Sequence, residues 1–162
     1  MTIATRPHHF TPRGLSLLAV FLALVLGVGI SIGVGIPPGD WYAGLEKPWF
    51  NPPNWLFAPA WTTLYILIAV AGWRTWLVDR TGPAMKLWVG QMLLNWAWTP
   101  VFFGLHLMWL GLLVILALAA VILAFVAWTW SRDRLSSVLM MPYLAWVSFA
   151  ASLNAALAWL NS

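Results

Sequence analysis

The sequence contains no cysteine and few charged residues. Only 7% of its 162 residues are Asp, Glu, Lys or Arg, whereas ordinary globular chains have about 25%. Without cysteine the chain has no disulfides, no thiolate nucleophiles and no iron–sulfur ligands. So few charges cannot cover a soluble particle of this size, and a disordered chain would be polar and poor in aromatic residues. The sequence therefore predicts an integral membrane protein.

Side chains that carry conventional catalysis are also scarce. The four carboxylates fall in connectors or at a helix end: Asp40, Glu46, Asp79 and Asp133. Proton-coupled carriers usually keep a carboxylate inside the membrane, and we expect no carboxylate inside the membrane-spanning part of this chain. No acidic pair, Ser–His–Asp set or phosphate-binding glycine loop is found. His8 and His9 are adjacent in a tail, and His106 lies alone in a turn, so we expect no metal site.

Long apolar runs are what the sequence does contain. Four stretches carry no charged residue: 14–39, 48–73, 87–131 and 135–162. A helix needs about 20 apolar residues to cross the membrane, so the third stretch is long enough for two spans. We expect an all-α membrane protein of one domain (1–162), a bundle of five transmembrane helices at 14–36, 54–78, 84–103, 107–130 and 135–160. The first run is too long for a signal-peptide core, so we expect it to remain in the protein.

Lys and Arg are distributed unevenly between the two sides of such a bundle. Seven of them share the side of the N-terminus: Arg6, Arg13, Arg74, Arg80, Lys86, Arg132 and Arg134. Only Lys47 falls on the other side. The positive-inside bias predicts a cytoplasmic N-terminus and an outward-facing first connector, 37–53. The same bias accounts for the net charge of +4 without a nucleic-acid partner.

Tryptophan is present in excess, with 14 residues. Many lie near span ends, as in the aromatic belt at the membrane–water boundary: Trp73, Trp76, Trp88, Trp109, Trp128, Trp130 and Trp159. Trp146 differs, because it lies roughly 18 Å along its helix from Arg134. Trp61, Trp96 and Trp98 also lie within spans. An indole N–H at such depth requires a hydrogen-bond partner.

Polar residues occur at matching depth. Gln91, Asn95 and Trp98 share one face of the third expected helix, and Trp146 and Asn154 share one face of the fifth. Two interpretations are open. The amides could join helices, each contributing about 1 kcal/mol. Alternatively, amides and indoles line a cavity between the second, third and fifth helices, which would suit a flat apolar ligand.

The first connector carries the most specific motif, WYAGLEKPWFNPPNW at 41–55, whose prolines and aromatic residues predict a stiff lid. With GQMLLNWAWTPVFFG at 90–104 and PYLAW at 142–146, it resembles the TspO/translocator family. This family is also known as tryptophan-rich sensory proteins and, in mammals, as the peripheral benzodiazepine receptor. The three motifs occur in order, and the resemblance covers about 15–160.

The resemblance implies a five-helix bundle, usually a homodimer, that binds porphyrins and benzodiazepine-type drugs beneath the first connector. The residues that match the family's pocket are Tyr42, Trp61, Asn95, Trp98 and Trp146. Trp61 and Trp146 match the pair implicated in light-dependent breakdown of protoporphyrin, which would make them catalytic. The resemblance implies a porphyrin ligand and no covalently bound cofactor.

Two further features bear on partners. Gly29 and Gly33 form a small-residue motif that suits close helix packing, either within the chain or between subunits. Unlike the mammalian members of the family that it resembles, the chain has no tyrosine and no basic residue after Asn154, so sterol recognition is not expected there.

Three functions remain open from the sequence. A receptor or sensor of tetrapyrroles needs only the pocket. A translocator of tetrapyrroles or other small hydrophobic molecules would often show an inverted repeat or broken helices, and neither is visible in the sequence. A light-dependent porphyrin-degrading enzyme would depend on tryptophan redox chemistry.

Overall fold

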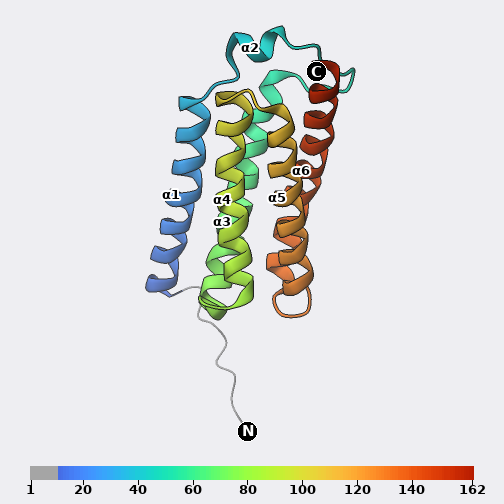
Figure 1. The fold of residues 1–162 in the computed structure, drawn as a ribbon. Helices are drawn as coiled ribbons and strands as arrows, with labels where there is room; N and C mark the ends of the chain where they lie inside the picture. The colour runs from blue at the N-terminus through green and yellow to red at the C-terminus, as the bar shows by residue number, and fades with distance from the viewer. Residues whose placement is uncertain (1–10) are drawn as a thin grey trace.

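The computed structural model describes residues 11–162, which are helical with no strand among them. Its elements are α1 (Pro12–Gly35), α2 (Gly39–Gly44), η1 (Asn54–Leu56), α3 (Phe57–Asp79), α4 (Pro83–Thr99), η2 (Pro100–Gly104), α5 (Met108–Thr129) and α6 (Arg134–Leu160). The long helices stand side by side, and α2 lies across one end of the bundle (Figure 1). The all-helical prediction is confirmed for these residues.

Within residues 11–162, four helices are long and apolar enough to cross a membrane: Pro12–Gly35, Asn54–Asp79, Met108–Thr129 and Arg134–Leu160. They agree with four of the expected spans to within two residues and support a multi-pass membrane protein. The expected span 84–103 is divided into α4, which has 17 residues, and η2. Because α4 alone is shorter than the ~20 residues of a typical span, the count of five remains a prediction.

Proline explains the division between α4 and η2. Pro100 has no backbone N–H and cannot continue the helical hydrogen bonding. The chain instead forms a wider π turn, in which the Leu105 N–H donates to the carbonyl of Pro100 at 2.9 Å. The turn ends at His106, which has a φ of 58°. This irregular segment places two phenylalanines, Phe102 and Phe103, beneath the first connector.

Side chains also define where helices begin. Thr11 accepts a hydrogen bond from the Gly14 N–H at 3.1 Å and caps α1. Asp133 caps α6 by accepting from the N–H of Ser136, and it also accepts from the Ser136 hydroxyl. The Arg74 guanidinium lies 2.8 Å from the Asp133 carboxylate. Burial alone would raise the pKa of Asp133, but the hydrogen bonds from Arg74 and Ser136 and the charge of Arg74 hold it below its ordinary value.

Helix packing follows a simple order. α1 packs on α3, α3 on α6, α6 on α5, and α5 on α4. The main core lies along the bundle and is built around fully buried side chains such as Ile68, Phe125 and Tyr143. A second, smaller core of Tyr42, Phe102, Leu153 and Leu157 lies beneath the first connector. The residues buried beneath the connector therefore form a core separate from the one that runs along the bundle.

The charged residues lie as the sequence predicted within the described part. Six of the seven cations assigned to one side lie in or beside the turns at the end opposite α2: Arg13, Arg74, Arg80, Lys86, Arg132 and Arg134. Arg6, His8 and His9 lie outside the described residues. Which end faces the cytoplasm stays a prediction.

Candidate functional site

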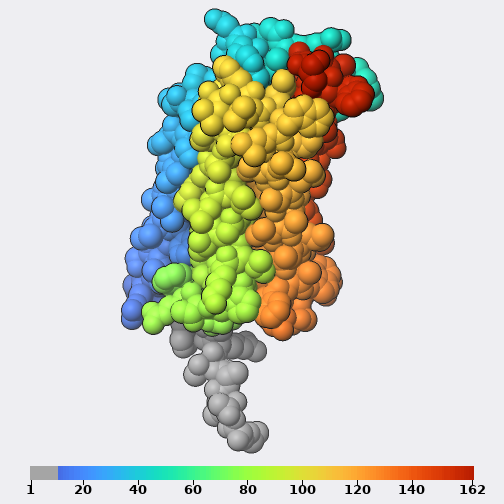
Figure 2. Space-filling model, viewed as in Figure 1, coloured from blue at the N-terminus to red at the C-terminus, as the bar shows by residue number. Residues whose placement is uncertain are grey.

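A cavity of about 880 Å³ lies beneath the first connector, where residues from α1, the connector, α3, α4, η2 and α6 surround it. The connector covers this end of the molecule, as the space-filling view shows (Figure 2). Most of the lining is aromatic or aliphatic, and the polar atoms come from a few side chains such as Asn54, Thr62 and Asn154. Such a lining suits a flat apolar ligand with a few polar groups.

Four of the five residues predicted to bind a ligand line this cavity: Tyr42, Trp61, Trp98 and Trp146. The fifth, Asn95, does not line it. Asn95 is buried below the cavity, where its amide donates to the Tyr143 hydroxyl at 2.9 Å and accepts from the Tyr65 hydroxyl at 3.4 Å. Because Tyr65 does line the cavity, Asn95 acts on the wall through Tyr65 rather than by direct contact.

Trp61 and Trp146 form the deeper aromatic wall. Their rings meet edge to face, with centroids 6.5 Å apart. Trp61 also lies 5.4 Å from the ring of Tyr65 and 6.3 Å from that of Tyr143. The Trp146 indole N–H is buried and has no hydrogen-bond partner among the described residues. Trp146 borders the cavity, but its indole nitrogen has almost no accessible surface, as is also true of the unpartnered N–H of Trp96, which does not line the cavity.

Trp98 is held in place by an amide. Its N–H donates to Asn154 Oδ1 at 3.2 Å, and Asn154 in turn donates to the backbone carbonyl of Met108 at 2.9 Å. The Trp98 ring stacks on Phe102 with a centroid distance of 5.1 Å. Asn154 therefore joins helices and lines the cavity, so the two interpretations of the amides hold together at this residue.

Tyr42 closes the cavity from the lid side. Its hydroxyl donates to Asn51 Oδ1 at 2.9 Å, and its ring meets Phe103 edge to face at 5.4 Å. Burial raises the pKa of Tyr42 above its ordinary value, so the hydroxyl stays protonated and can donate at neutral pH. The short helix α2, which the sequence did not predict, sets this position.

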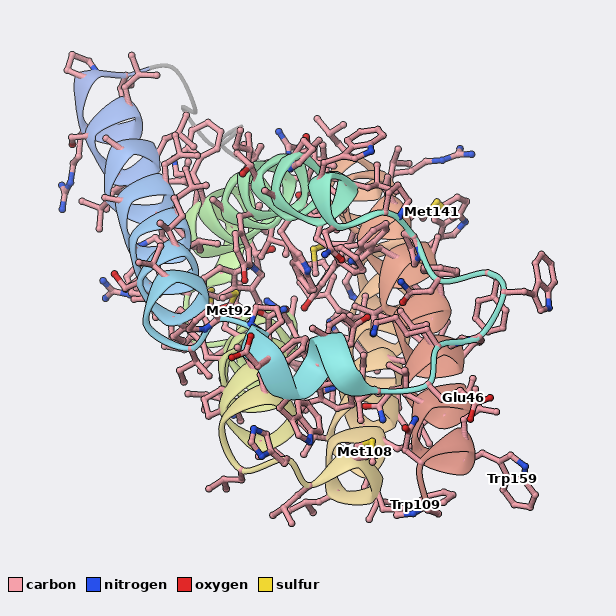
Figure 3. The ribbon with its side chains drawn as sticks, turned by 90° about the horizontal axis from the view of Figure 1, so that it is seen from above. Glu46, Met92, Met108, Trp109, Met141 and Trp159 are labelled. Atoms are coloured by element: carbon pink, nitrogen blue, oxygen red, sulfur yellow. The ribbon has the colours of Figure 1, made fainter. Side chains whose placement is uncertain are left out.

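Two further contacts fasten the lid to the bundle. Near the end of α6, the Asn161 side chain accepts from the Glu46 N–H at 2.9 Å and donates to the Glu46 carbonyl at 3.0 Å. At the α4–α5 turn, the His106 ring stacks on Trp41 with centroids 4.1 Å apart. Glu46 lies above the end of α6 in the view from the lid side (Figure 3).

α1 forms a wall of the cavity, although we expected only the second, third and fifth helices there. Gly29, Ile30, Gly33 and Val34 all line it. A Cβ on Gly29 would lie 2.6 Å from Cζ of Tyr65, so this glycine lets the Tyr65 ring pack against the helix backbone. The small-residue motif therefore serves contact within the chain at Gly29. The motif was visible in the sequence, but the sequence did not show that Gly29 packs against Tyr65.

The tryptophans assigned to the membrane belt divide into two groups. Trp128 and Trp159 are 39% and 79% exposed, and Trp159 points away from the bundle (Figure 3). Trp73 and Trp88 are buried, so their assignment to the belt is wrong. Their N–H groups donate to the carbonyls of Gly14 at 2.8 Å and Ile68 at 2.9 Å. Position near a span end did not reveal which way these rings face.

Comparison with known proteins finds similar sequences over most of the chain. The model of the TspO/MBR family matches residues 19–160. The chain is 37% identical to the tryptophan-rich sensory protein of Cereibacter sphaeroides over 139 residues, covering 86% of this chain and 87% of that protein. It is 38% identical to the tryptophan-rich protein TspO of Archaeoglobus fulgidus over 151 residues (91% and 98%). It is 34% identical to the human translocator protein over 145 residues (84% and 85%).

Proposed function

Because the chain belongs to the TspO/MBR family, we propose that it is a membrane receptor that binds porphyrins and related flat molecules, benzodiazepine-type ligands included, in the cavity beneath the 37–53 connector. The cavity has a volume of about 880 Å³, which lies within the range of about 300–1,000 Å³ typical of small-molecule pockets. The aromatic lining supplies surfaces on which a tetrapyrrole could stack.

The two indole rings at the cavity wall, those of Trp61 and Trp146, carry the proposal. They present aromatic surface to an apolar cavity, and flat aromatic ligands pack favourably on such surface. Trp61 and Trp146 would hold the flat face of the ligand, Trp98 and Tyr42 its outer parts, and Asn95 would position Tyr65.

Filling the cavity tests the proposal. Ala150 lines the cavity on α6, so the Ala150→Phe side chain would occupy the ligand's volume. Protoporphyrin titrated into the purified protein in darkness should quench tryptophan fluorescence in the wild type and not in this variant. Ala127→Phe, on the exposed face of α5, is the matched control and should bind normally. Equal binding by both variants would place the ligand elsewhere.

A second function, light-dependent porphyrin degradation, is favoured by the edge-to-face contact of Trp61 and Trp146 at the wall. An excited porphyrin there would lie against the two indoles, which are readily oxidised side chains. Loss of porphyrin absorbance under light, with a new product, would support this function. Binding without consumption would leave a receptor, and flux of porphyrin into sealed vesicles would instead indicate translocation.

We also propose that α4 and η2 together form a fifth span, that the end opposite α2 faces the cytoplasm, and that the chain forms a homodimer. Cysteines introduced at Thr81 and Gly44, which lie at opposite ends of the bundle, should then label from opposite sides of intact cells. Labelling of Thr81→Cys from outside would reverse the orientation. A third cysteine, at the exposed Leu105 after η2, should label from the side opposite Thr81, and labelling of Thr81→Cys and Leu105→Cys from the same side would show that α4 and η2 do not cross the membrane. Light scattering of the detergent-solubilised protein would measure its oligomeric state.

A further inference from the structure

Lys47 is the charged residue among the described side chains that line the cavity. It lies in the lid, half-buried, with its ammonium 5.0 Å from the centre of the Tyr42 ring. The ammonium donates to the backbone carbonyls of Ala43 at 3.0 Å and Leu45 at 3.1 Å. An ammonium has three N–H donors, so one donor remains beyond these two bonds.

The charge of Lys47 is not paired within the described residues. The two acceptors of Lys47 are neutral carbonyls. The ion pair found among the described residues is Arg74–Asp133, which lies at the other end of the bundle. The neighbouring Glu46 is exposed and held by Asn161 through its backbone. A cation beside an apolar cavity attracts anions more strongly than one in open water, because few solvent dipoles screen it.

We infer that the cavity selects flat apolar ligands carrying an anionic group, such as a carboxylate, which Lys47 binds beneath the lid while Trp61 and Trp146 hold the apolar body. This rests on the proposed function and adds the class of ligand. Porphyrins that carry carboxylate side chains on one edge of the ring have this division between a charged edge and an apolar body. A fully esterified or uncharged porphyrin lacks the anionic group.

A purely structural role for Lys47 is the competing explanation. Its acceptors lie at the C-terminal end of α2 (Gly39–Gly44), where a cation satisfies carbonyls that the helix leaves free. A structural role would affect every ligand of the cavity to the same extent. Recognition of an anion would affect only ligands that carry one.

The test compares protoporphyrin with its dimethyl ester, titrated in darkness into the wild type, Lys47→Met and Lys47→Arg. Met keeps the length of the side chain without its charge, and Arg keeps the charge. Lys47→Met should weaken protoporphyrin binding about tenfold, as expected for losing one charge-assisted hydrogen bond, and should leave the ester within about twofold. Lys47→Arg should restore most of the difference, and wild-type protoporphyrin binding should weaken with added salt while ester binding does not.

Lys86→Met is the matched control, because Lys86 is an exposed cation at the other end of the bundle and should change neither affinity. Equal weakening of both ligands by Lys47→Met would assign Lys47 a structural role and overturn the inference. Unchanged affinity for both would overturn it as well. If the wild type bound the ester and the diacid equally, ligand selection by charge would fail while the pocket stood. If it bound neither, the proposed function itself would fail.

Discussion

The two ends of the bundle use tryptophan in different ways. At the end away from the lid, the N–H groups of Trp73 and Trp88 donate to backbone carbonyls of neighbouring helices. At the lid end, the N–H of Trp146 has no partner among the described residues and the ring faces a cavity. Trp73 and Trp88 therefore join helices at the first end, here called the packed end, whereas Trp146 borders a cavity at the lid end, where Trp98 lines the cavity and also joins helices through Asn154.

Hydrogen bonds between polar side chains differ in the same way. At the packed end, the hydroxyls of Thr129 and Ser137 lie 2.7 Å apart and join α5 to α6. At the lid end, Asn161 and Tyr42 bind segments of the connector. Bonds between rigid helices break only when the bundle comes apart, whereas bonds to a connector can break locally. We expect substitutions at the packed end to lower stability and those at the lid end to change binding.

Two glycines provide the strongest test of this difference. A Cβ on Gly72 would lie 2.6 Å from the indole nitrogen of Trp88, and one on Gly29 would lie 2.6 Å from Cζ of Tyr65. Trp88 is buried and hydrogen-bonded, so Gly72→Ala should lower the free energy of unfolding by about 2–4 kcal/mol. Tyr65 borders the cavity and can move into it, so Gly29→Ala should lower it by less than about 1 kcal/mol.

Thermal unfolding followed by circular dichroism would measure both changes. Gly33→Ala is the control, because nothing lies within 4 Å of a Cβ built there. Equal losses for Gly72→Ala and Gly29→Ala would mean that the cavity provides no room for the Tyr65 ring, and the contrast between the two ends would not hold.

The Arg74–Asp133 pair gives the next largest effect, again at the packed end. Asp133→Asn keeps a capping side chain but loses the charge, and should lower stability at pH 7 by about 1–2 kcal/mol. Since the pKa of Asp133 is lowered in the folded protein, its contribution is present above the unfolded-state pKa of about 4 and is lost as the pH falls through the folded value.

Melting temperatures of wild type and Asp133→Asn should therefore converge as the pH is lowered from 7 to below 4. Asp79→Asn, at an exposed carboxylate of the same end, should differ little from wild type at any of these pH values. A constant difference between wild type and Asp133→Asn across this range would show that the charge of Asp133 does not contribute.

Substitutions at the lid end should change ligand binding. Trp146→Phe and Trp61→Phe should weaken porphyrin binding by about 2- to 12-fold, because each removes an indole surface worth roughly 0.5–1.5 kcal/mol. They should also suppress any light-driven consumption of porphyrin. Trp128→Phe and Trp159→Phe, at exposed rings, should change neither property. Similar behaviour of all four variants in fluorescence titrations would contradict a tryptophan-lined site.

The depth of a residue along its helix could be estimated from the sequence, and this depth identified most of the tryptophans that line the cavity. Trp61, Trp98 and Trp146 stood out because they lie far from the charges that mark the ends of the spans. Which way each ring points depends on the neighbouring helix, and sequence alone does not give that neighbour. This is why Trp73 and Trp88 were assigned to the belt although both are buried.

The same limit explains two other differences. Asn95 shares a helix face with Trp98, but it lies nearly a full turn deeper, where Tyr65 and Tyr143 occupy the space between the helices. The contribution of α1 to the wall depends on how Tyr65 packs over Gly29, a contact between residues far apart in the sequence. The membrane class followed from the scarcity of charges, and the helical fold followed from the length of the charge-free stretches.

The fastening of the lid gives the smallest expected effect and the clearest separation of binding from stability. Asn161→Ala removes both hydrogen bonds to the backbone of Glu46. These bonds are exposed, so their loss should speed ligand release only about 2- to 5-fold and leave the melting temperature unchanged. Pro52→Gly with Pro53→Gly should also speed release, because glycine loosens the connector without removing an aromatic ring. Stopped-flow measurement of porphyrin dissociation tests both. Ser162→Ala is the control, since the Ser162 hydroxyl accepts from Trp109 of α5 and donates to the Ala158 carbonyl of α6, both within the bundle. If release from Asn161→Ala were as slow as from wild type, the connector would cover the cavity without limiting escape, and the lid end would differ from the packed end in shape rather than in mobility.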